Sequence, residues 1–92
     1  MYYVYILRCT DGSLYTGITT DPERRFAQHA GTRPGGARYT AAHPPLRYEL
    51  LHPCRDRREA SRQEAGIKAL SRREKEALIA GRRPWPDSEA PA

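Results

Sequence analysis

Glu64 is an acidic residue at an apolar position of an expected helix. Ala60, Glu64 and Ile67 follow one another at i, i+4 and i+7, which places them on one stripe of that helix. A carboxylate on such a stripe is unfavourable unless it is paired or binds a metal ion. The alternative is a surface glutamate that forms an i,i+4 ion pair with Lys68. The first interpretation predicts a metal ligand, and the second predicts only a helix-stabilising pair.

Arg25 and His29 are a second pair of residues that could carry out chemistry. They are four positions apart in an expected helix and therefore share one face, while Phe26 and Ala30 form the adjacent stripe, which is expected in the core. An arginine beside a histidine can bind a phosphate and transfer a proton. The alternative interpretation is a solvated basic face.

The tyrosines near the start of the chain are the third set. Strand alternation places Tyr3 and Tyr5 on one face, opposite Tyr2 and Val4, and Tyr15 lies in the next expected strand. The alternative is that they pack as ordinary strand residues. The sequence contains neither a glycine-rich phosphate loop nor a nucleophile elbow.

Composition narrows the class of protein. The 92 residues predict one domain with a small core, and the net charge of +5 favours a polyanionic partner such as nucleic acid. A basic protein with no such partner is the alternative. Cys9 and Cys54 form no disulfide framework or metal motif, and we expect both to be reduced, in the cytoplasm. No signal peptide and no membrane-spanning run is recognisable, so no membrane partner is expected.

The elements that must position these residues begin with a hairpin. Residues 2–7 and 14–18 have strand composition, and Asp11-Gly12 between them is a strong turn signal. Thr20 and Glu23 form a capping box, which predicts a helix to about residue 30. Residues 31–45 are expected to be a loop.

The second half of the chain predicts one strand and two helices. Residues 46–51 form the strand, in which Leu46, Tyr48 and Leu50 are expected to share one face. A helix is expected over residues 56–70, and a capping box of Ser71 and Glu74 begins another that reaches about residue 80. The predicted fold is α+β, a small three-stranded antiparallel sheet covered by helices in the order β-β-α-β-α-α. We expect a domain over residues 1–81 and a flexible C-terminal tail over 82–92.

Several of these segments together resemble the GIY-YIG nuclease domain. They are residues 3–7 (Tyr-Val-Tyr-Ile-Leu), residues 11–19 (Asp-Gly-Ser-Leu-Tyr-Thr-Gly-Ile-Thr), Arg25-x-x-x-His29 and residues 67–72. The likeness covers roughly residues 2–80 and is greatest to the short stand-alone bacterial single-domain branch. More distantly, the chain resembles the N-terminal nuclease domain of the nucleotide-excision-repair excinuclease and the homing endonucleases.

The resemblance implies a site composed of the three sets described above. It implies that Tyr5, Tyr15, Arg25, His29 and Glu64 are catalytic, with Glu64 as the ligand of a divalent metal, Mg²⁺ or alternatively Mn²⁺. At position 18 this chain has Ile18, where the excision-repair members have a lysine, so His29 becomes the expected proton acceptor. The asparagine that some homing members carry after the glutamate has no clear match.

The function implied is a metal-dependent endonuclease. It would hydrolyse phosphodiester bonds, in DNA repair or recombination intermediates, with little sequence specificity and as a monomer. The alternatives are a non-catalytic nucleic-acid-binding module that keeps the fold, and an interaction protein with no nucleic-acid role. Basic residues expected to contact phosphates are Arg24, Arg33, Arg38 and Lys68.

Overall fold

The structure, a computed structural model of the chain, describes residues 1–86. It is an α+β fold with one three-stranded antiparallel sheet and helices on it, as predicted. In chain order the elements are β1 (Tyr2–Cys9), β2 (Leu14–Thr19), α1 (Pro22–His29), α2 (Arg38–Ala42), β3 (Pro45–Cys54), α3 (Arg57–Lys68) and α4 (Arg72–Ile79). Among the described residues, no helix is long and apolar enough to cross a membrane.

The sheet has the order β2-β1-β3, so β1 is its central strand. β1 and β2 form the predicted hairpin. At its turn, Gly12 has a φ of 88°, a conformation that glycine adopts without strain. In the register of the hairpin Tyr5 faces Gly17, and on the other side of β1 it faces Leu51. Tyr5 therefore lies in the middle of the sheet, with β2 on one side and β3 on the other.

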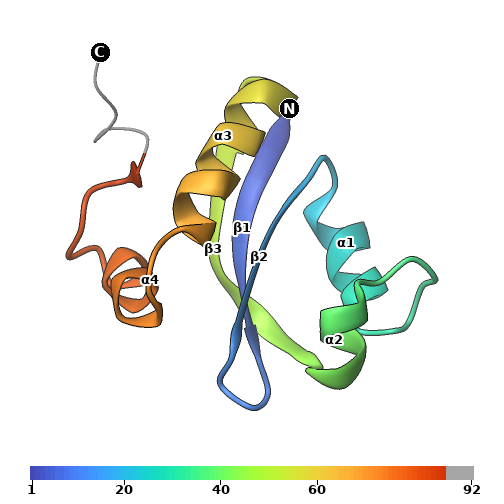
Figure 1. Cartoon of the computed structure of the whole chain (residues 1–92). Helices are drawn as coiled ribbons and strands as arrows, with labels where there is room; N and C mark the ends of the chain where they lie inside the picture. Colours follow the sequence, from blue (N-terminus) through green and yellow to red (C-terminus); the bar gives the residue numbers. More distant parts are fainter. Residues whose placement is uncertain (87–92) are drawn as a thin grey trace.

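Helices lie on both faces of the sheet. Figure 1 shows α3 and α4 on one side of the strands and α1 and α2 on the other. Alternation along β1 sends Val4 and Ile6 toward α3 and α4, whereas Tyr5 points to the side of α1. The apolar core between the sheet, α3 and α4 contains Val4, Ile6, Cys54, Ala60, Ile67 and Leu78.

A β-bulge changes which residues of β3 share a face. The register against β1 shifts between Ile6, which faces Leu50, and Leu7, which faces Tyr48, so Glu49 is the extra residue. Leu50 consequently packs on the α3 side, whereas Tyr48 packs against the Tyr5 ring on the α1 side. The expectation that Leu50 and Tyr48 share one face was therefore wrong.

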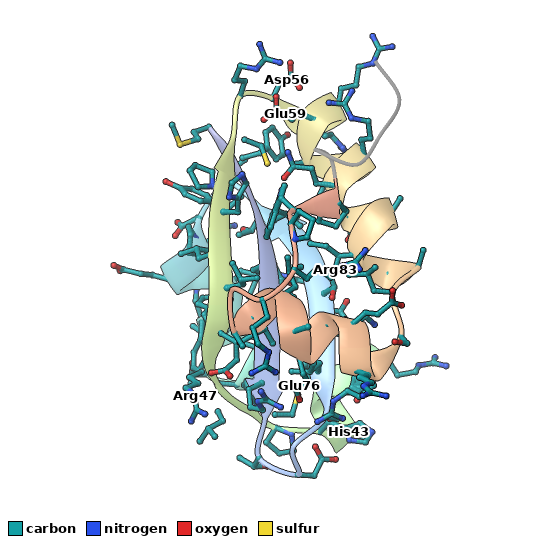
Figure 2. All side chains as sticks on the ribbon, turned by 90° about the vertical axis from the view of Figure 1, so that its left-hand side faces the viewer. His43, Arg47, Asp56, Glu59, Glu76 and Arg83 are labelled. Carbon is teal, nitrogen blue, oxygen red and sulfur yellow. The ribbon has the colours of Figure 1, made fainter. Side chains whose placement is uncertain are left out.

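The bulge coincides with a network of ion pairs that connects the sheet to α4. The Arg8 guanidinium lies 2.9 Å from the Glu49 carboxylate and 2.8 Å from that of Glu76. Figure 2 labels Glu76 on α4 and Arg47, which also pairs with Glu49. The Arg8 hydrogen bond lowers the pKa of Glu76 to about 2. This network holds α4 near the end of the sheet, on the face away from α1.

The helix ends follow local capping chemistry, with one correction. Ser71 and Glu74 form the predicted capping box of α4, and Asp56 caps α3. Pro22 is the first residue of α1, but its cap is Asp21, whose side chain accepts a hydrogen bond from the Arg24 amide. The capping box expected at Thr20 was wrong, because the adjacent aspartate reaches the free amides instead.

The segment 31–45 holds one short helix that the sequence did not predict. α2 has five residues, and its N-cap, Ala37, makes no side-chain hydrogen bond. Tertiary contacts replace the missing local signal. Thr40 is buried against His29, while His43 pairs with Asp11 in the hairpin turn, the end of the molecule where Figure 2 labels His43. The prediction of a loop throughout this segment was wrong for α2.

The residues after α4 return to the α3 side of the sheet. The Trp85 indole donates a 2.8 Å hydrogen bond to the Gln63 side chain and packs on the His52 ring, 4.2 Å between centroids. The predicted tail begins at residue 82. Trp85 belongs to it, so part of this segment packs on the domain. Its remainder, residues 87–92, lies outside the described residues.

Candidate active site

The Tyr5 hydroxyl is the centre of a polar cluster beneath α1. The residue is only 1% exposed, and its hydroxyl lies 2.8 Å from Nε2 of His29. Arg25 donates to the same oxygen through Nε at 3.4 Å. One buried phenol oxygen is therefore shared between a basic ring nitrogen and a guanidinium.

Gly17 creates the space for this arrangement. Tyr5 lies across its cross-strand partner Gly17, so closely that a Cβ on Gly17 would lie 2.5 Å from the Tyr5 hydroxyl oxygen. Because β2 is an edge strand, the phenol reaches across it toward the edge of the sheet. The glycine is needed for close approach of a side chain, since its own φ is not in the left-handed region.

The i,i+4 spacing on α1 brings Arg25 and His29 to Tyr5 together. The Arg25 guanidinium is held by the Gln28 side chain at 3.0 Å and the Gly35 carbonyl at 2.9 Å, both through Nη1. Within residues 1–86, Nη2 of Arg25 makes no hydrogen bond. One edge of a fixed guanidinium thus remains able to bind an oxyanion.

His29 is an uncharged base in this environment. The residue is 3% exposed, and both ring nitrogens are hydrogen-bonded, Nε2 to Tyr5 and Nδ1 to the Thr40 hydroxyl at 2.8 Å. Burial, with a smaller contribution from the positive charge of Arg25, lowers the pKa of His29 to about 4. At neutral pH the ring can therefore accept a proton.

Tyr5 is a neutral phenol in the same environment. Burial raises its pKa above the ordinary value of 10, while the hydrogen bond and charge of Arg25 act in the opposite direction. A preformed tyrosinate is thus disfavoured. The geometry suits proton transfer through Tyr5, in which the hydroxyl gives its proton to His29 as it receives another.

Tyr15 forms the outer side of this cluster. Its ring centroid lies 5.2 Å from that of His29 and 6.5 Å from that of Tyr5. Tyr39 of α2 lies beyond it at 5.6 Å. The Tyr15 hydroxyl makes no hydrogen bond in the part of the chain that the structure describes, so it can bind a water or a phosphate oxygen.

Glu64 lies at the margin of the buried stripe of α3. The buried residues of that stripe are Ala60, Gln63 and Ile67. Ala60 and Ile67 were expected there together with Glu64, but the structure buries the neighbouring Gln63 in its place. The Glu64 side chain is 23% exposed and forms the i,i+4 pair with Lys68 at 3.4 Å. Its negative charge also adds to the burial that raises the pKa of Tyr5, so the carboxylate lies within electrostatic range of the cluster.

The donor set at Glu64 fits a weakly coordinated Mg²⁺. No group of three or more acidic, histidine or cysteine side chains that could hold a metal occurs among residues 1–86. Mg²⁺ commonly uses one or two carboxylates together with waters and substrate phosphates, and does not need an all-protein site. A single, partly exposed carboxylate within electrostatic range of the Tyr5 cluster meets that requirement.

The expected phosphate-contacting residues belong to α1, to α2 and the segment before it, and to α3. Arg24 is exposed on α1, Arg33 lies in the segment before α2, and Arg38 is the first residue of α2. None of these three forms an ion pair with a residue in the range 1–86. Lys68 ends α3 and is paired with Glu64.

Two residues of the cluster were not predicted from the sequence. Thr40 contacts His29 from α2, and Tyr48 packs edge-on against the Tyr5 ring at 5.3 Å while its hydroxyl donates to the Pro22 carbonyl. Neither has a local signal, because the first depends on an unpredicted helix and the second on the bulge. Ile18, at the position where the excision-repair members have a lysine, packs into the core on the other face.

Comparison with known proteins agrees with the motifs. Residues 1–77 match the family model of the GIY-YIG catalytic domain. A UPF0213 protein of Desulfotalea psychrophila is 46% identical over 78 residues, covering 85% of this chain and 70% of that protein. One from Xanthomonas axonopodis pv. citri is 47% identical over 78 residues, covering 85% and 74%.

A solved structure supports the same relationship. The solution NMR structure of a UPF0213 protein from Bacillus halodurans is similar to this one with a TM-score of 0.56 and 43% sequence identity. The similarity covers 97% of this chain and 95% of that one. The family model spans every element from β1 into α4. The chain therefore belongs to the GIY-YIG nuclease family.

Proposed function

We propose that this protein is a divalent-metal-dependent endonuclease that hydrolyses phosphodiester bonds, with Tyr5, Tyr15, Arg25, His29 and Glu64 as its active site. The observation that carries the proposal is the buried Tyr5 hydroxyl between the Arg25 guanidinium and Nε2 of His29. A merely structural tyrosine does not require both an uncharged base and a phosphate-binding group on one oxygen.

The reaction begins with a water held by the Tyr5 hydroxyl. As the water oxygen bonds to phosphorus, its proton passes to the Tyr5 oxygen and the Tyr5 proton passes to Nε2 of His29. Arg25 binds a non-bridging oxygen through its free edge and stabilises the charge of the transition state. Tyr15 orients the water or the phosphate. The bond from phosphorus to the leaving oxygen breaks, and that oxygen is protonated by solvent.

Glu64 is the residue that would hold Mg²⁺, or Mn²⁺ in its place. When bound, the cation supplies charge stabilisation at the phosphate and the leaving oxygen. Lys68, already paired with Glu64 at 3.4 Å, is then free to contact a neighbouring phosphate. In this scheme Glu64 acts through its negative charge. Replacing it with a neutral amide therefore removes its ability to hold the cation.

The proposed substrate is DNA, bound through its backbone. Arg24, Arg33 and Arg38 supply guanidinium groups near α1 and α2 that pair with no carboxylate of residues 1–86, and contacts to phosphates carry no sequence information. We therefore propose little sequence specificity and action on repair or recombination intermediates. Because the two cysteines, Cys9 and Cys54, form no disulfide framework in their spacing, we propose that the protein acts in a reducing compartment, the cytoplasm, and that it acts as a monomer.

A nicking assay tests this function. Supercoiled plasmid and branched DNA are incubated with the protein, with Mg²⁺ or with EDTA, and each is compared with Tyr5→Phe. The matched control is Tyr2→Phe on the opposite face of β1. Mg²⁺-dependent nicking that Tyr5→Phe abolishes and Tyr2→Phe retains supports the enzyme. Binding without cleavage by the parent protein would instead identify a non-catalytic nucleic-acid-binding module.

A further inference from the structure

A continuous chain of hydrogen bonds runs from Arg25 to the backbone at the start of α2. Arg25 donates to the Tyr5 oxygen, and the Tyr5 hydroxyl lies 2.8 Å from Nε2 of His29. Nδ1 of His29 lies 2.8 Å from the Thr40 oxygen, and the Thr40 hydroxyl donates to the Ala37 carbonyl at 3.0 Å. Tyr5, His29 and Thr40 each have one hydrogen-bond partner in this series on either side. The groups at its two ends therefore determine which atom donates in each hydrogen bond between them.

The Ala37 end determines which nitrogen of His29 carries the hydrogen. A carbonyl oxygen can only accept, and a threonine hydroxyl has a single hydrogen, which Thr40 gives to Ala37. The Thr40 oxygen must then accept from His29. Nδ1 of His29 is consequently an N–H donor, and in the neutral ring Nε2 keeps its lone pair.

The Arg25 end leads to the same result independently. A guanidinium only donates, so Arg25 cannot accept the hydrogen of the Tyr5 hydroxyl. Within residues 1–86, Nε2 of His29 is the acceptor that remains for that hydrogen. Both ends therefore require a ring protonated at Nδ1 and free at Nε2.

We infer that Thr40 is a positioning residue that holds His29 in the Nδ1–H tautomer, with Nε2 ready to take the proton of Tyr5. Its part in turnover rests on the proposed nuclease function. When the Tyr5 proton arrives, the N–H bond forms at Nε2 and the O–H bond of Tyr5 breaks. The Nδ1–H of the resulting imidazolium stays bonded to Thr40, so the charged ring has a partner on both sides.

The opposite tautomer would stop this transfer. With the hydrogen on Nε2, the ring would donate to the Tyr5 oxygen, which already receives a hydrogen bond from Arg25. Within residues 1–86 the Tyr5 hydrogen would then have no acceptor, and no lone pair would be available at Nε2 to take it. Thr40 thus acts on the reaction through the ring of His29.

Imidazole ¹⁵N NMR of the full chain, without metal, tests the tautomer directly. The resonances of His29 are identified by their absence in His29→Gln, which separates them from His43 and His52. At neutral pH, Nδ1 should resonate as a protonated nitrogen and Nε2 as an unprotonated one. The reverse pattern in the parent protein would overturn the inference.

Two further variants separate Thr40 from Tyr5 as the cause. In Tyr5→Phe only Thr40 is left to hold the ring, and the Nδ1–H pattern should persist. In Tyr5→Phe combined with Thr40→Val, the two ¹⁵N shifts should move together, as in a mixture of tautomers. A mixture already present in Tyr5→Phe alone would show that Thr40 does not hold the tautomer.

Activity then tests the role in turnover. Thr40→Val keeps the shape of the side chain and removes its oxygen, so kcat for nicking should fall with KM unchanged, by less than the roughly 10²–10⁴-fold that the general base itself contributes. Thr40→Ser should restore most of it. The matched control is Thr16→Val, because the buried Thr16 hydroxyl, on β2, makes no hydrogen bond in the described part of the chain. An unchanged kcat in Thr40→Val would refute the role.

Failure of the nuclease proposal and failure of the inference on Thr40 give different results in these experiments. If the parent protein cleaves no DNA while its ¹⁵N pattern depends on Thr40 as described, the nuclease proposal is wrong and the tautomer assignment stands. If the parent cleaves DNA but shows the Nε2–H pattern, the nuclease proposal stands and the inference on Thr40 is wrong. Should Thr40→Val fail to fold, the parent, Tyr5→Phe and Thr40→Ser spectra still decide the tautomer.

Discussion

The ring of Tyr5 lies against Gly17 with no room for a side chain between them. A Cβ on Gly17 would be 2.5 Å from the Tyr5 hydroxyl oxygen and 2.7 Å from Cζ, distances that real Cβ atoms do not adopt. The two residues are cross-strand partners in the hairpin, so neither backbone can withdraw without disturbing the β1–β2 register. The position of the phenol thus depends on the absence of a side chain one strand away.

Gly17→Ala should therefore displace the Tyr5 hydroxyl from His29 and Arg25. We expect a loss of about 1–3 kcal/mol in the free energy of unfolding, as for other overpacked sites, together with a large loss of nicking. Denaturant unfolding and the plasmid assay measure the two effects. In a Tyr5→Phe background the same change should destabilise less, because the closest clashing atom is gone. Equal destabilisation in both backgrounds would show that the clash is not with the Tyr5 hydroxyl.

The lowered pKa of His29 predicts how stability depends on pH. The folded value is about 4 and the ordinary value is 6.5, so between these the unfolded chain takes up a proton that the folded chain does not. Stability should fall as the pH falls from about 6.5 toward 4, and this contribution should level off below that. At about 1.4 kcal/mol per pKa unit, the full effect is roughly 3 kcal/mol.

The measurement is the difference in unfolding free energy between the parent protein and His29→Gln across this pH range. Carboxylates titrate in both proteins, and their effect cancels in the difference. The stability advantage of the parent over the variant should shrink as the pH falls. Parallel stability curves for the two proteins would show that His29 titrates normally in the folded state.

Glu64→Gln should separate the loss of a metal ligand from the loss of structure. Mg²⁺-dependent nicking should fall by two orders of magnitude or more, because the charge stabilisation supplied by a divalent cation is worth several kcal/mol. Stability should change little, since the pair with Lys68 on this partly exposed surface is worth about 0.2–0.5 kcal/mol. Melting temperature and nicking are measured on one preparation.

Glu59→Gln is the matched control for Glu64. It lies in the first turn of the same helix, where Figure 2 labels it, and it forms an i,i+4 pair of its own with Arg55. We expect this variant to nick at the parental rate after a comparably small change in stability. Parental nicking by Glu64→Gln as well would remove Glu64 as the metal ligand.

The location of the basic residues, and not the net charge alone, should determine DNA affinity. Replacing Arg33 and Arg38 with glutamine should weaken binding to all DNA sequences and reduce the slope of log affinity against log salt by about 1 for each lost phosphate contact. Fluorescence anisotropy at several salt concentrations measures this slope.

The control for this prediction removes the same charge elsewhere. Arg58 of α3 and Arg73 of α4 are exposed and belong to helices on the other side of the sheet from α1 and α2. Their double replacement with glutamine lowers the net charge equally, but the salt slope should remain near that of the parent protein. Equal slopes for both double variants would mean that DNA is not bound at the α1–α2 side.

Much of the framework could be predicted from local signals. The turn at Asp11-Gly12, the capping box of Ser71 and Glu74, and the alternation along β1 each act within a few residues, and the structure contains all three. The family motifs identified Tyr5, Tyr15, Arg25 and His29 as one site, and the structure brings these four side chains together around the Tyr5 ring. Their catalytic role stays a prediction.

Local signals failed where distant segments compete for the same groups. The bulge at Glu49 reverses the faces of Tyr48 and Leu50, and its ion pair with Arg8 joins residues 41 positions apart. Periodicity on α3 could not distinguish Glu64 from its buried neighbour Gln63, because Gln63 is buried through its contacts with Cys54 and Trp85. These are properties of packing, which alternation and helical spacing do not contain.

The chemistry of His29 shows most clearly which properties the sequence determines and which the tertiary structure determines. The sequence by itself determined that a histidine lies one helical turn from Arg25, since an i,i+4 pair shares a face in any α-helix. Only the tertiary structure decided what that histidine can do. The ring is buried by elements distant in sequence, and its two nitrogens are bound by Tyr5 of β1 and Thr40 of α2. A lowered pKa and a single tautomer follow from desolvation and from hydrogen-bond direction, and both exist only once those elements have come together.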